Sequence, residues 1–266
     1  MVRHRHCALV VLCLSTLSCL ESGAAQSAST AAAKTSAKIW VGRYRETEEY
    51  LRTAECMNME QLTIYMARCV LRPGGPVSRI AWLPLPPGVY RGFFTSYKTQ
   101  IAAYELDKLL KMDMVPPSVE RQVQGKTGAA TLWVENVDTW KGETPPGDVN
   151  RAEWNKQVAR MTMFDALIGN RDRLPGQMLR DGAWNLILLD HTRAFGPSAD
   201  ARFLWSQIDG NYWARVLALT RKELDARLRP WLNETEITAI LERRDRIKAE
   251  IDRLIAERGT AAVVLR

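Results

Sequence analysis

The sequence has little histidine and cysteine, the two residue types that most often build zinc centres and nucleophilic sites. It contains three histidines and five cysteines among 266 residues, and five of these eight precede residue 26. The remaining three are Cys56, Cys69 and His191. A zinc site with Cys/His spacing is therefore excluded in the rest of the chain. A hydrolase triad would depend on His191 alone, and no GxSxG motif marks its nucleophile.

The sequence also lacks a basic stripe interleaved with aromatic side chains, the pattern that is typical of nucleic-acid binding. Its net charge is +7, and the most densely charged stretch, LERRDRIKAEIDRLIAERG, is nearly balanced, with six basic and five acidic residues. Acidic and basic residues alternate there at helical spacing, as on a solvated helix face. No nucleic-acid partner is expected.

Long apolar runs are absent except near the N-terminus. A basic start precedes a mainly apolar run over residues 7–20, and small residues follow at Gly23 and Ala25. This pattern predicts a signal peptide over residues 1–25 and export of the mature protein to the periplasm or the medium. Two alternatives stay open: a membrane anchor, although the run is shorter than the ~20 residues that a span needs, and lipid attachment at Cys19. After signal cleavage, no membrane span is expected.

The redox state of the two cysteines that remain after cleavage depends on the compartment of the mature protein. Export allows Cys56 and Cys69 to form a disulfide. Such a bond would stabilise the fold by about 3 kcal/mol in the chain-entropy model. Two buried free thiols are the alternative.

Composition divides the rest of the chain into three parts. Residues 26–39 are small and polar without an apolar period, which predicts a flexible leader. Residues 40–140 show helix and strand patterns and are expected to form a small mixed N-terminal lobe, and residues 141–266 a mainly helical C-terminal lobe. Proline and glycine in residues 138–150 predict a hinge between them. The predicted fold class is α+β.

Within the first lobe, apolar spacing predicts helices and strands in a mixed order. The clearest helix has a broad apolar face and a cap at Ser96 or Thr99. The predicted elements are a helix over residues 45–59, strands over 61–71 and 77–85, a helix over 96–114, and two strands flanking a turn at Gly125–Gly128.

A stretch in the second lobe, MFDALIGNRDRLPGQMLRDGAWNLILLD, combines a helix end, a polar turn, a hairpin and an apolar strand. The turn contains Asn170, Asp172 and Arg173, Gln177 follows, and Asp190 stands at the strand exit. Phosphoryl transfer needs a carboxylate to orient the attacking hydroxyl and further oxygens to hold Mg²⁺. The hairpin would bring Asp172 and Asp190 to two walls of one cleft. The alternative is that these residues form surface ion pairs and caps.

This order of motifs resembles the catalytic and metal-binding loops of atypical kinases: secretory-pathway kinases of the Golgi casein-kinase type, HipA-like bacterial kinases and phosphatidylinositol 3/4-kinases. The similarity extends over residues 48–258 and includes the segments SYKTQIAAYELDKLLKMDMVPPSVER, LWVE, FDALIGNRDR, LLDHTRAF and a late ERRDRI helix. Exported bacterial proteins of the secretory-kinase type share these segments. The resemblance implies a two-lobed protein-kinase-like fold that uses ATP with Mg or Mn.

The resemblance also implies roles for single residues. Asp172 matches the catalytic aspartate, and Asp190 matches the metal ligand that begins the DFG segment of kinases. Asn170 and Arg173 match residues that shape the loop, and Gln177 stands where a second metal ligand, an asparagine, is expected. The neighbours of the metal aspartate that we interpret as structural are His191 and Arg193.

Three positions depart from the family pattern at one mechanistic point. Leu83 replaces the lysine that contacts the nucleotide phosphates, Gln100 replaces the glutamate that pairs with that lysine, and Gln177 replaces the asparagine. The first two changes fit each other, because a glutamate without its lysine would be an unpaired buried charge. The candidates for a substitute cation, each of which could equally be a solvated surface residue, are Lys98, Lys108 and Arg79.

Two functions of different classes follow from the resemblance. As an enzyme, the protein would transfer a phosphoryl group from a nucleotide to a protein, lipid or small hydroxyl substrate. As a pseudokinase, it would bind a nucleotide or a protein without turnover. Export weighs against the enzyme, because little ATP is present outside the cytoplasm.

Overall fold

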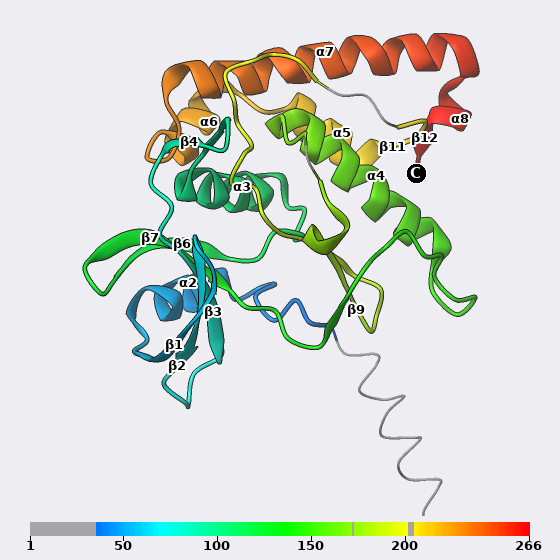
Figure 1. The fold of residues 1–266 in the computed structure, drawn as a ribbon. Helices are drawn as coiled ribbons and strands as arrows, with labels where there is room; N and C mark the ends of the chain where they lie inside the picture. Colours follow the sequence, from blue (N-terminus) through cyan, green and yellow to red (C-terminus); the bar gives the residue numbers. More distant parts are fainter. Residues whose placement is uncertain (1–35, 172, 202–204) are drawn as a thin grey trace, which may run out of the picture.

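A five-stranded antiparallel sheet is the body of the N-terminal lobe (Figure 1). The structure, a computed structural model, describes residues 36–171, 173–201 and 205–266. Across the sheet the strands follow the order β1-β2-β3-β7-β6. They are β1 (Cys56–Thr63), β2 (Met66–Leu71), β3 (Arg79–Leu83), β6 (Ser118–Val123) and β7 (Lys126–Leu132). Together with the helices described below, this sheet confirms the predicted α+β fold class.

The two faces of this sheet have different neighbours. Helix α2 (Tyr44–Thr53) packs on one face, where Ile80 and Trp82 of β3 belong to the buried core of the lobe. Side chains alternate along a strand, so Ala81 and Leu83 point to the opposite face. Both of these residues line the cavity between the lobes.

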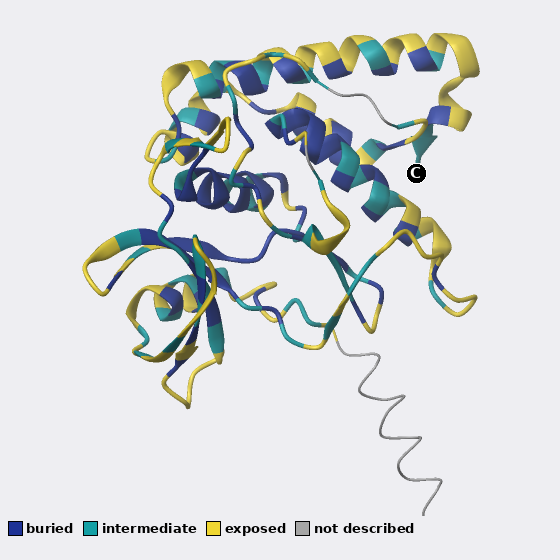
Figure 2. Ribbon diagram, viewed as in Figure 1, coloured by how far each residue is buried: buried dark blue, intermediate teal, exposed yellow. Residues whose placement is uncertain are grey.

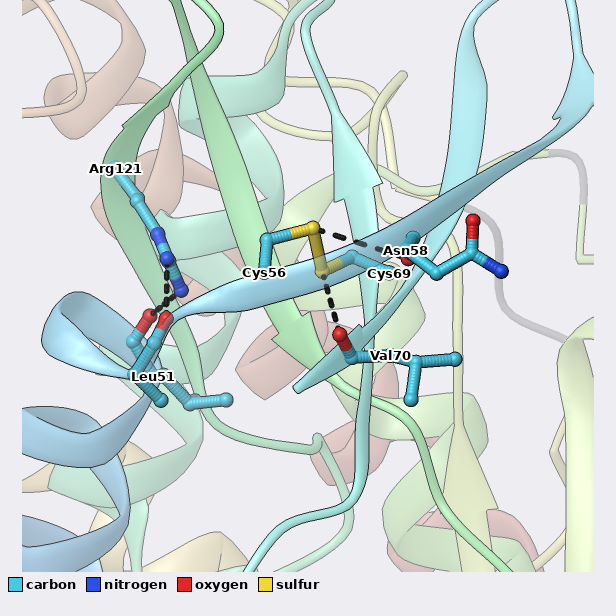
Figure 3. The surroundings of a disulfide bond; sticks show 7 residues. Leu51, Cys56, Asn58, Cys69, Val70 and Arg121 are labelled. Carbon is cyan, nitrogen blue, oxygen red and sulfur yellow. Dashed lines mark hydrogen bonds between the residues drawn. A yellow bond between two sulfur atoms is a disulfide. The ribbon is translucent and has the colours of Figure 1, made fainter. Parts of the chain in front are cut away.

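A disulfide joins β1 to β2 (Figure 3). The Cα atoms of Cys56 and Cys69 lie 5.8 Å apart and their sulfur atoms are bonded. Of the two alternatives from the sequence, a disulfide or two free thiols, the structure has the disulfide. Nearby, Arg121 points to the end of α2 and donates hydrogen bonds to the carbonyl oxygens of Leu51 (3.0 Å) and Ala54. Burial lowers the pKa of Arg121. These contacts fasten α2 and β1 to the sheet.

The β1–β2 hairpin corrects the sequence prediction for this region. The predicted helix ends at Thr53 rather than near Met59, and the single predicted strand spans the hairpin turn at residues 64–65. β1 is exposed along most of its length, so it lacks the apolar alternation that marks a half-buried strand. The β6–β7 turn lies earlier than predicted, at Gln124 and Gly125, with φ of +51° and +76°.

Helix α3 (Tyr97–Leu110) lies between the sheet and the helices of the C-terminal lobe (Figure 1). Ser96, one of the two predicted caps, accepts a hydrogen bond from the N–H of Lys98 at 3.0 Å. Most of the helix is buried (Figure 2). It is preceded by a short hairpin that the sequence patterns did not predict, formed by β4 (Gly88–Tyr90) and β5 (Phe93–Thr95).

The chain crosses from the sheet to the C-terminal lobe through residues 133–136. The next strand, β8 (Val137–Thr139), pairs with β9 (Met178–Asp181), which in turn pairs with β10 (Leu186–Leu188). The hairpin predicted before Asp190 is therefore present. It carries the chain from the end of the polar turn back to the cleft.

Helices form most of the C-terminal lobe (Figure 1). The first, α4 (Arg151–Ile168), begins after Asn150, which caps it by accepting the N–H of Glu153 at 3.1 Å, and ends at Gly169. Among the described residues, no helix combines the length and apolarity needed to cross a membrane. The other elements are η1 (Pro175–Gln177), β11 (Ile208–Asp209), α5 (Gly210–Leu217), α6 (Arg221–Leu228), α7 (Glu234–Arg258), α8 (Thr260–Val263) and β12 (Val264–Leu265).

The last residues of the predicted leader contact the folded chain. Ala37 donates its backbone N–H to the carboxylate of Asp181 at 2.9 Å, and Trp40 is fully buried in the N-terminal core. Burial lowers the pKa of Lys38 to about 8, although the carboxylates of Asp107 and Asp181 oppose this shift. The predicted signal peptide and the first part of the leader lie outside the described residues.

A buried arginine connects α7 to two other segments, the end of α4 before the polar turn and the chain that follows the strand exit at Asp190. Arg243 donates hydrogen bonds to the carbonyl oxygens of Leu167 (2.7 Å), Gly196 (3.0 Å) and Ser198 (2.6 Å). Burial lowers its pKa to about 10. Gly169 has φ +67°, and a Cβ atom there would lie 3.2 Å from the guanidinium. Glycine therefore permits both the helix end and the close approach.

Replacing both Cys56 and Cys69 by alanine should lower the free energy of unfolding by about 3 kcal/mol, because the disulfide restricts the unfolded chain. Denaturant unfolding under oxidising and reducing conditions measures this difference. Reduced wild-type protein should unfold close to the midpoint of the double variant. Equal midpoints for the oxidised wild type and the variant would contradict the prediction.

Arg243→Met should lower the free energy of unfolding by about 2–4 kcal/mol, since buried carbonyl groups lose their donor. The matched control is Arg246→Met on the same helix, which removes an exposed ion pair with Asp200. That pair should contribute less than about 1 kcal/mol. Chemical denaturation compares the two variants, and equal losses would show that the buried contacts of Arg243 have no special weight.

Candidate functional site

A cavity of about 920 Å³ lies between the lobes. Four of the predicted site residues line it, from β3, α3, η1 and the exit of β10: Leu83, Gln100, Gln177 and Asp190. Three other predicted residues do not line it: Lys98, Asn170 and Arg173. The predicted base, Asp172, lies outside the described residues.

Asp190 is held in a fixed orientation at the cavity wall. It has a left-handed backbone conformation, with φ +53°, which is uncommon for a residue other than glycine. Its Oδ1 accepts a hydrogen bond from the hydroxyl of Thr192 at 2.7 Å, and its Oδ2 accepts one from the side-chain amide of Gln177 at 2.9 Å. The carboxylate is therefore positioned by both the preceding η1 turn and the following residues.

Gln177 turns its amide nitrogen, and not its oxygen, toward Asp190. The amide Oε1 accepts a hydrogen bond from the backbone N–H of Leu174 at 3.0 Å. A cation that used this oxygen would require the amide to rotate and Leu174 to lose its acceptor. In the part of the chain that the structure describes, no three His, Cys, Asp or Glu side chains converge on a metal site. Asp190 would thus hold Mg²⁺ or Mn²⁺ together with phosphate and water oxygens, which is the usual mode for Mg²⁺.

The polar turn is organised around a carboxylate that sequence reasoning missed. Asp165, near the end of α4, receives two hydrogen bonds from Arg173: Nε to Oδ2 at 2.9 Å and Nη2 to Oδ1 at 2.6 Å. Asn170 adds a third from its side-chain amide to Oδ1 at 2.9 Å. A bidentate arginine–carboxylate pair has a well-defined geometry. Asn170 and Arg173 are therefore anchored to α4 through Asp165, and they do not line the cavity.

Arg173 also reaches the strand exit that leads to Asp190. Its Nη1 donates a hydrogen bond to the carbonyl oxygen of Leu189 at 2.5 Å, and its Nη2 lies 3.0 Å from Nε2 of His191. Burial, followed by the charge of Arg173, lowers the pKa of His191 well below its ordinary value. The imidazole is therefore neutral and accepts from the guanidinium. One side chain thus links the polar turn to both neighbours of Asp190.

His191 is fully buried and does not line the cavity. Its ring packs edge-to-face against Phe164 of α4, with the ring centroids 5.9 Å apart. A buried neutral imidazole in this position cannot reach a substrate in the cleft. The geometry therefore supports the structural role expected for His191.

Gln100 links α3 to the same segment. Its Oε1 accepts the backbone N–H of His191 at 2.9 Å, and its amide nitrogen donates to the hydroxyl of Ser118 at 3.4 Å. Both ends of the neutral amide therefore have partners, although no lysine faces it from β3. A glutamate at this position would place a charge without a cation in buried surroundings.

Leu83 occupies an apolar wall of the cleft. It packs against a small cluster formed by Tyr97, Ile101 and Ala129. Trp82 points to the opposite side and is buried in the N-terminal core, so it does not fill the cavity. The cleft is open and has an apolar surface at Leu83, the position that the sequence resemblance matches to the lysine of the kinases.

The three cations proposed as substitutes do not lie in the cavity wall. Lys108 pairs with Glu48 at 2.6 Å and with Glu105 at 3.0 Å, and Arg79 forms a bidentate pair with Glu135. The arginines that do line the cavity are Arg91 and Arg193. Sequence reasoning missed Arg91 because it lies in the turn of the unpredicted β4–β5 hairpin.

Asp165 and Thr192 are the other residues that sequence reasoning missed. Asp165 gave a usable signal, since it is an acidic residue within the otherwise apolar helix end MFDALIG. Buried carboxylates are rare without a partner, so a search for a nearby arginine would have found Arg173. Thr192 gave no such signal, because a threonine after a turn is common at protein surfaces.

No protein-family model matches the sequence, and no curated protein matches it. Solved structures do match. The Golgi casein kinase with Mn/ADP bound is 14% identical with a TM-score of 0.62, covering 82% of this chain and 78% of its own. Hydra Fam20 with sugar is 15% identical with a TM-score of 0.64, covering 89% and 97%. The proinflammatory kinase CtkA of Helicobacter pylori is 12% identical with a TM-score of 0.52, covering 78% and 98%. The chain has the kinase-like fold of these atypical kinases.

Proposed function

We propose that the interlobe cleft binds a nucleotide together with Mg²⁺ or Mn²⁺ and that the protein transfers the terminal phosphoryl group to a hydroxyl acceptor. The observation that carries this proposal is the position of Asp190, fixed by Gln177 and Thr192 at the wall of an open cavity in a kinase-like fold. The cavity volume, about 920 Å³, lies in the range of small-molecule and cofactor sites. Mn and ADP in a structural neighbour support this ligand class.

The divalent cation, when bound, would neutralise charge on the transferred phosphate. Asp190 supplies a carboxylate oxygen for it, and Gln177 an amide oxygen if its side chain rotates. Asp172 is proposed as the base that orients the acceptor hydroxyl. Arg173 contacts both neighbours of Asp190, Leu189 and His191. Asp165 in turn anchors Arg173 and Asn170.

The second candidate function is a pseudokinase that binds a nucleotide or a protein without turnover. Leu83 favours it, since β3 offers an apolar surface in place of a phosphate-binding lysine. Loss of one charge-assisted hydrogen bond weakens affinity by roughly ten- to a hundredfold. The proposed export, which the Cys56–Cys69 disulfide supports, also favours this candidate because nucleotide is scarce outside the cytoplasm.

Nucleotide binding should raise the thermal unfolding midpoint of the wild-type protein by a few degrees at 100 times the dissociation constant, where ligand adds about 2.7 kcal/mol. The shift should require Mn²⁺ or Mg²⁺ and should disappear in Asp190→Ala. Asp138→Ala, which removes an exposed carboxylate of the same lobe, is the control and should keep the shift. No shift with any nucleotide in the wild type would overturn the nucleotide site.

Asp172→Asn separates the two candidate functions. If the protein is an enzyme, this variant should retain the nucleotide-dependent stabilisation and lose turnover by about 10²–10⁴-fold, the usual contribution of a positioned base. Radiolabelled phosphate transfer to protein, lipid and small hydroxyl acceptors measures it. Nucleotide binding without turnover in the wild type, and no effect of the substitution, would establish the pseudokinase.

A further inference from the structure

We propose that Thr131 determines which base the nucleotide cleft accepts, because its hydroxyl oxygen can accept a hydrogen bond from the ligand but cannot donate one. The ligand class is a nucleotide whose base carries an exocyclic amino group, as adenine does, and not a carbonyl group at that position. This inference rests on the proposed nucleotide site and assigns the choice of base within it. Thr131 lines the interlobe cavity together with Asp190 and Leu83.

The side chain of Thr131 lies on the cavity face of the sheet. Its neighbours on β7, Ala130 and Leu132, belong to the buried core on the other face, and side chains alternate along a strand. Across the strands Thr131 stands opposite Ala81 of β3, which also lines the cavity. Directly opposed residues on paired strands have their side chains on one face, so the register and the alternation agree.

A chain of buried hydrogen bonds fixes the direction in which the Thr131 hydroxyl donates. It begins at the backbone N–H of His191, which can only donate and which Oε1 of Gln100 accepts at 2.9 Å. This contact assigns the two ends of the Gln100 amide, so its nitrogen is the end that meets Ser118 Oγ, at 3.4 Å. Ser118 is fully buried, and its hydroxyl therefore depends on partners within the protein.

The single proton of the Ser118 hydroxyl has a fixed acceptor. Ser118 donates it to the carbonyl oxygen of Pro116 at 3.2 Å, a group that can only accept. The remaining contact of Ser118 Oγ is with Oγ1 of Thr131 at 2.9 Å. A hydroxyl has one proton and two lone pairs, so all three bonds of Ser118 form together only when Thr131 donates in this contact. The opposite direction would take the donor from Pro116 and leave the Thr131 proton unused.

Thr131 therefore offers the cavity a lone pair and no proton. On β3 and β7, which the structure describes throughout, the other lining side chains are apolar: Ala81, Leu83 and Leu132. Ligand sites commonly combine such an apolar surface with a few polar groups that give specificity. The apolar face of a base fits this wall, and the amino group of adenine would satisfy Thr131, whereas the carbonyl group of a base such as guanine would set two acceptors together. Thr131 could donate to that carbonyl only by breaking its bond to Ser118.

Calorimetry on the purified protein with saturating Mn²⁺ compares ADP with inosine diphosphate, which has a carbonyl group in place of the adenine amino group. The wild type should bind ADP roughly tenfold or more tightly than inosine diphosphate. Thr131→Val removes the hydroxyl at nearly the same shape and should reduce this preference by about tenfold, whereas Thr131→Ser should keep it. Thr127→Val is the matched control, because Thr127 lies on the same strand outside the cavity wall, and it should bind both diphosphates like the wild type.

Ser118→Ala tests the direction of the hydrogen bond, since Ser118 is buried behind Thr131 and does not line the cavity. Without Ser118 as its acceptor, the Thr131 hydroxyl is free to turn and donate to a carbonyl group. Inosine diphosphate should then bind more tightly than it binds to the wild type, while ADP binding changes less and shows that the variant is folded. An unchanged or weaker affinity for inosine diphosphate, with ADP binding intact, would contradict the fixed direction.

The outcomes separate this inference from the proposed function. If the wild type does not prefer ADP, or if Thr131→Val has the same preference as the wild type, the role of Thr131 is overturned and the nucleotide site stands. A preference that is lost in Thr131→Val and kept in Thr131→Ser supports it. Failure of the wild type to bind either diphosphate in the presence of Mn²⁺ overturns both.

Discussion

The largely buried ion pair between Asp165 and Arg173 is the constraint on which the rest of the cleft depends. Through it, the end of α4 is joined to the polar turn, and the other nitrogens of the same guanidinium reach Leu189 and His191. Buried charges must be paired and hydrogen-bonded, so the position of each segment limits the others. The strand exit at Asp190 is therefore held by Arg173, which Asp165 of α4 anchors, as well as by the β9–β10 hairpin.

Leu83 and Gln100, the two neutral residues at positions where the resemblance places a lysine and a glutamate, both have suitable surroundings. Leu83 lies on an apolar cluster, and Gln100 gives both ends of its amide to polar partners instead of to a lysine. Gln100 still connects α3 to the segment after Asp190. It does so by accepting the backbone N–H of His191, while its amide nitrogen donates to the hydroxyl of Ser118. The kinase-like fold is thus present although Leu83 stands where the sequence resemblance places a lysine. The arginines that line the cavity, Arg193 and Arg91, lie in the turn after Asp190 and in the turn of the β4–β5 hairpin.

Local patterns predicted those parts of the site that lie close together in the sequence. Gln177 and Asp190 are 13 residues apart and meet through one hairpin. Gln100 and His191 are 91 residues apart, and no periodicity could reveal their contact; the family resemblance placed Gln100 near the site, not its partner. β1 was missed because an exposed strand has no apolar alternation, and the β4–β5 hairpin because its strands have three residues each.

In the proposed function, Asp190 holds a divalent cation against a nucleotide in the interlobe cleft. The most direct test is a crystal structure of the protein grown with ADP and Mn²⁺, with anomalous scattering measured at the manganese edge. We expect an anomalous peak within about 2.0–2.3 Å of an Asp190 carboxylate oxygen, near the distances of hard cations to oxygen ligands, with the phosphates beside it. An empty cleft, or manganese and nucleotide bound elsewhere on the molecule, would contradict it.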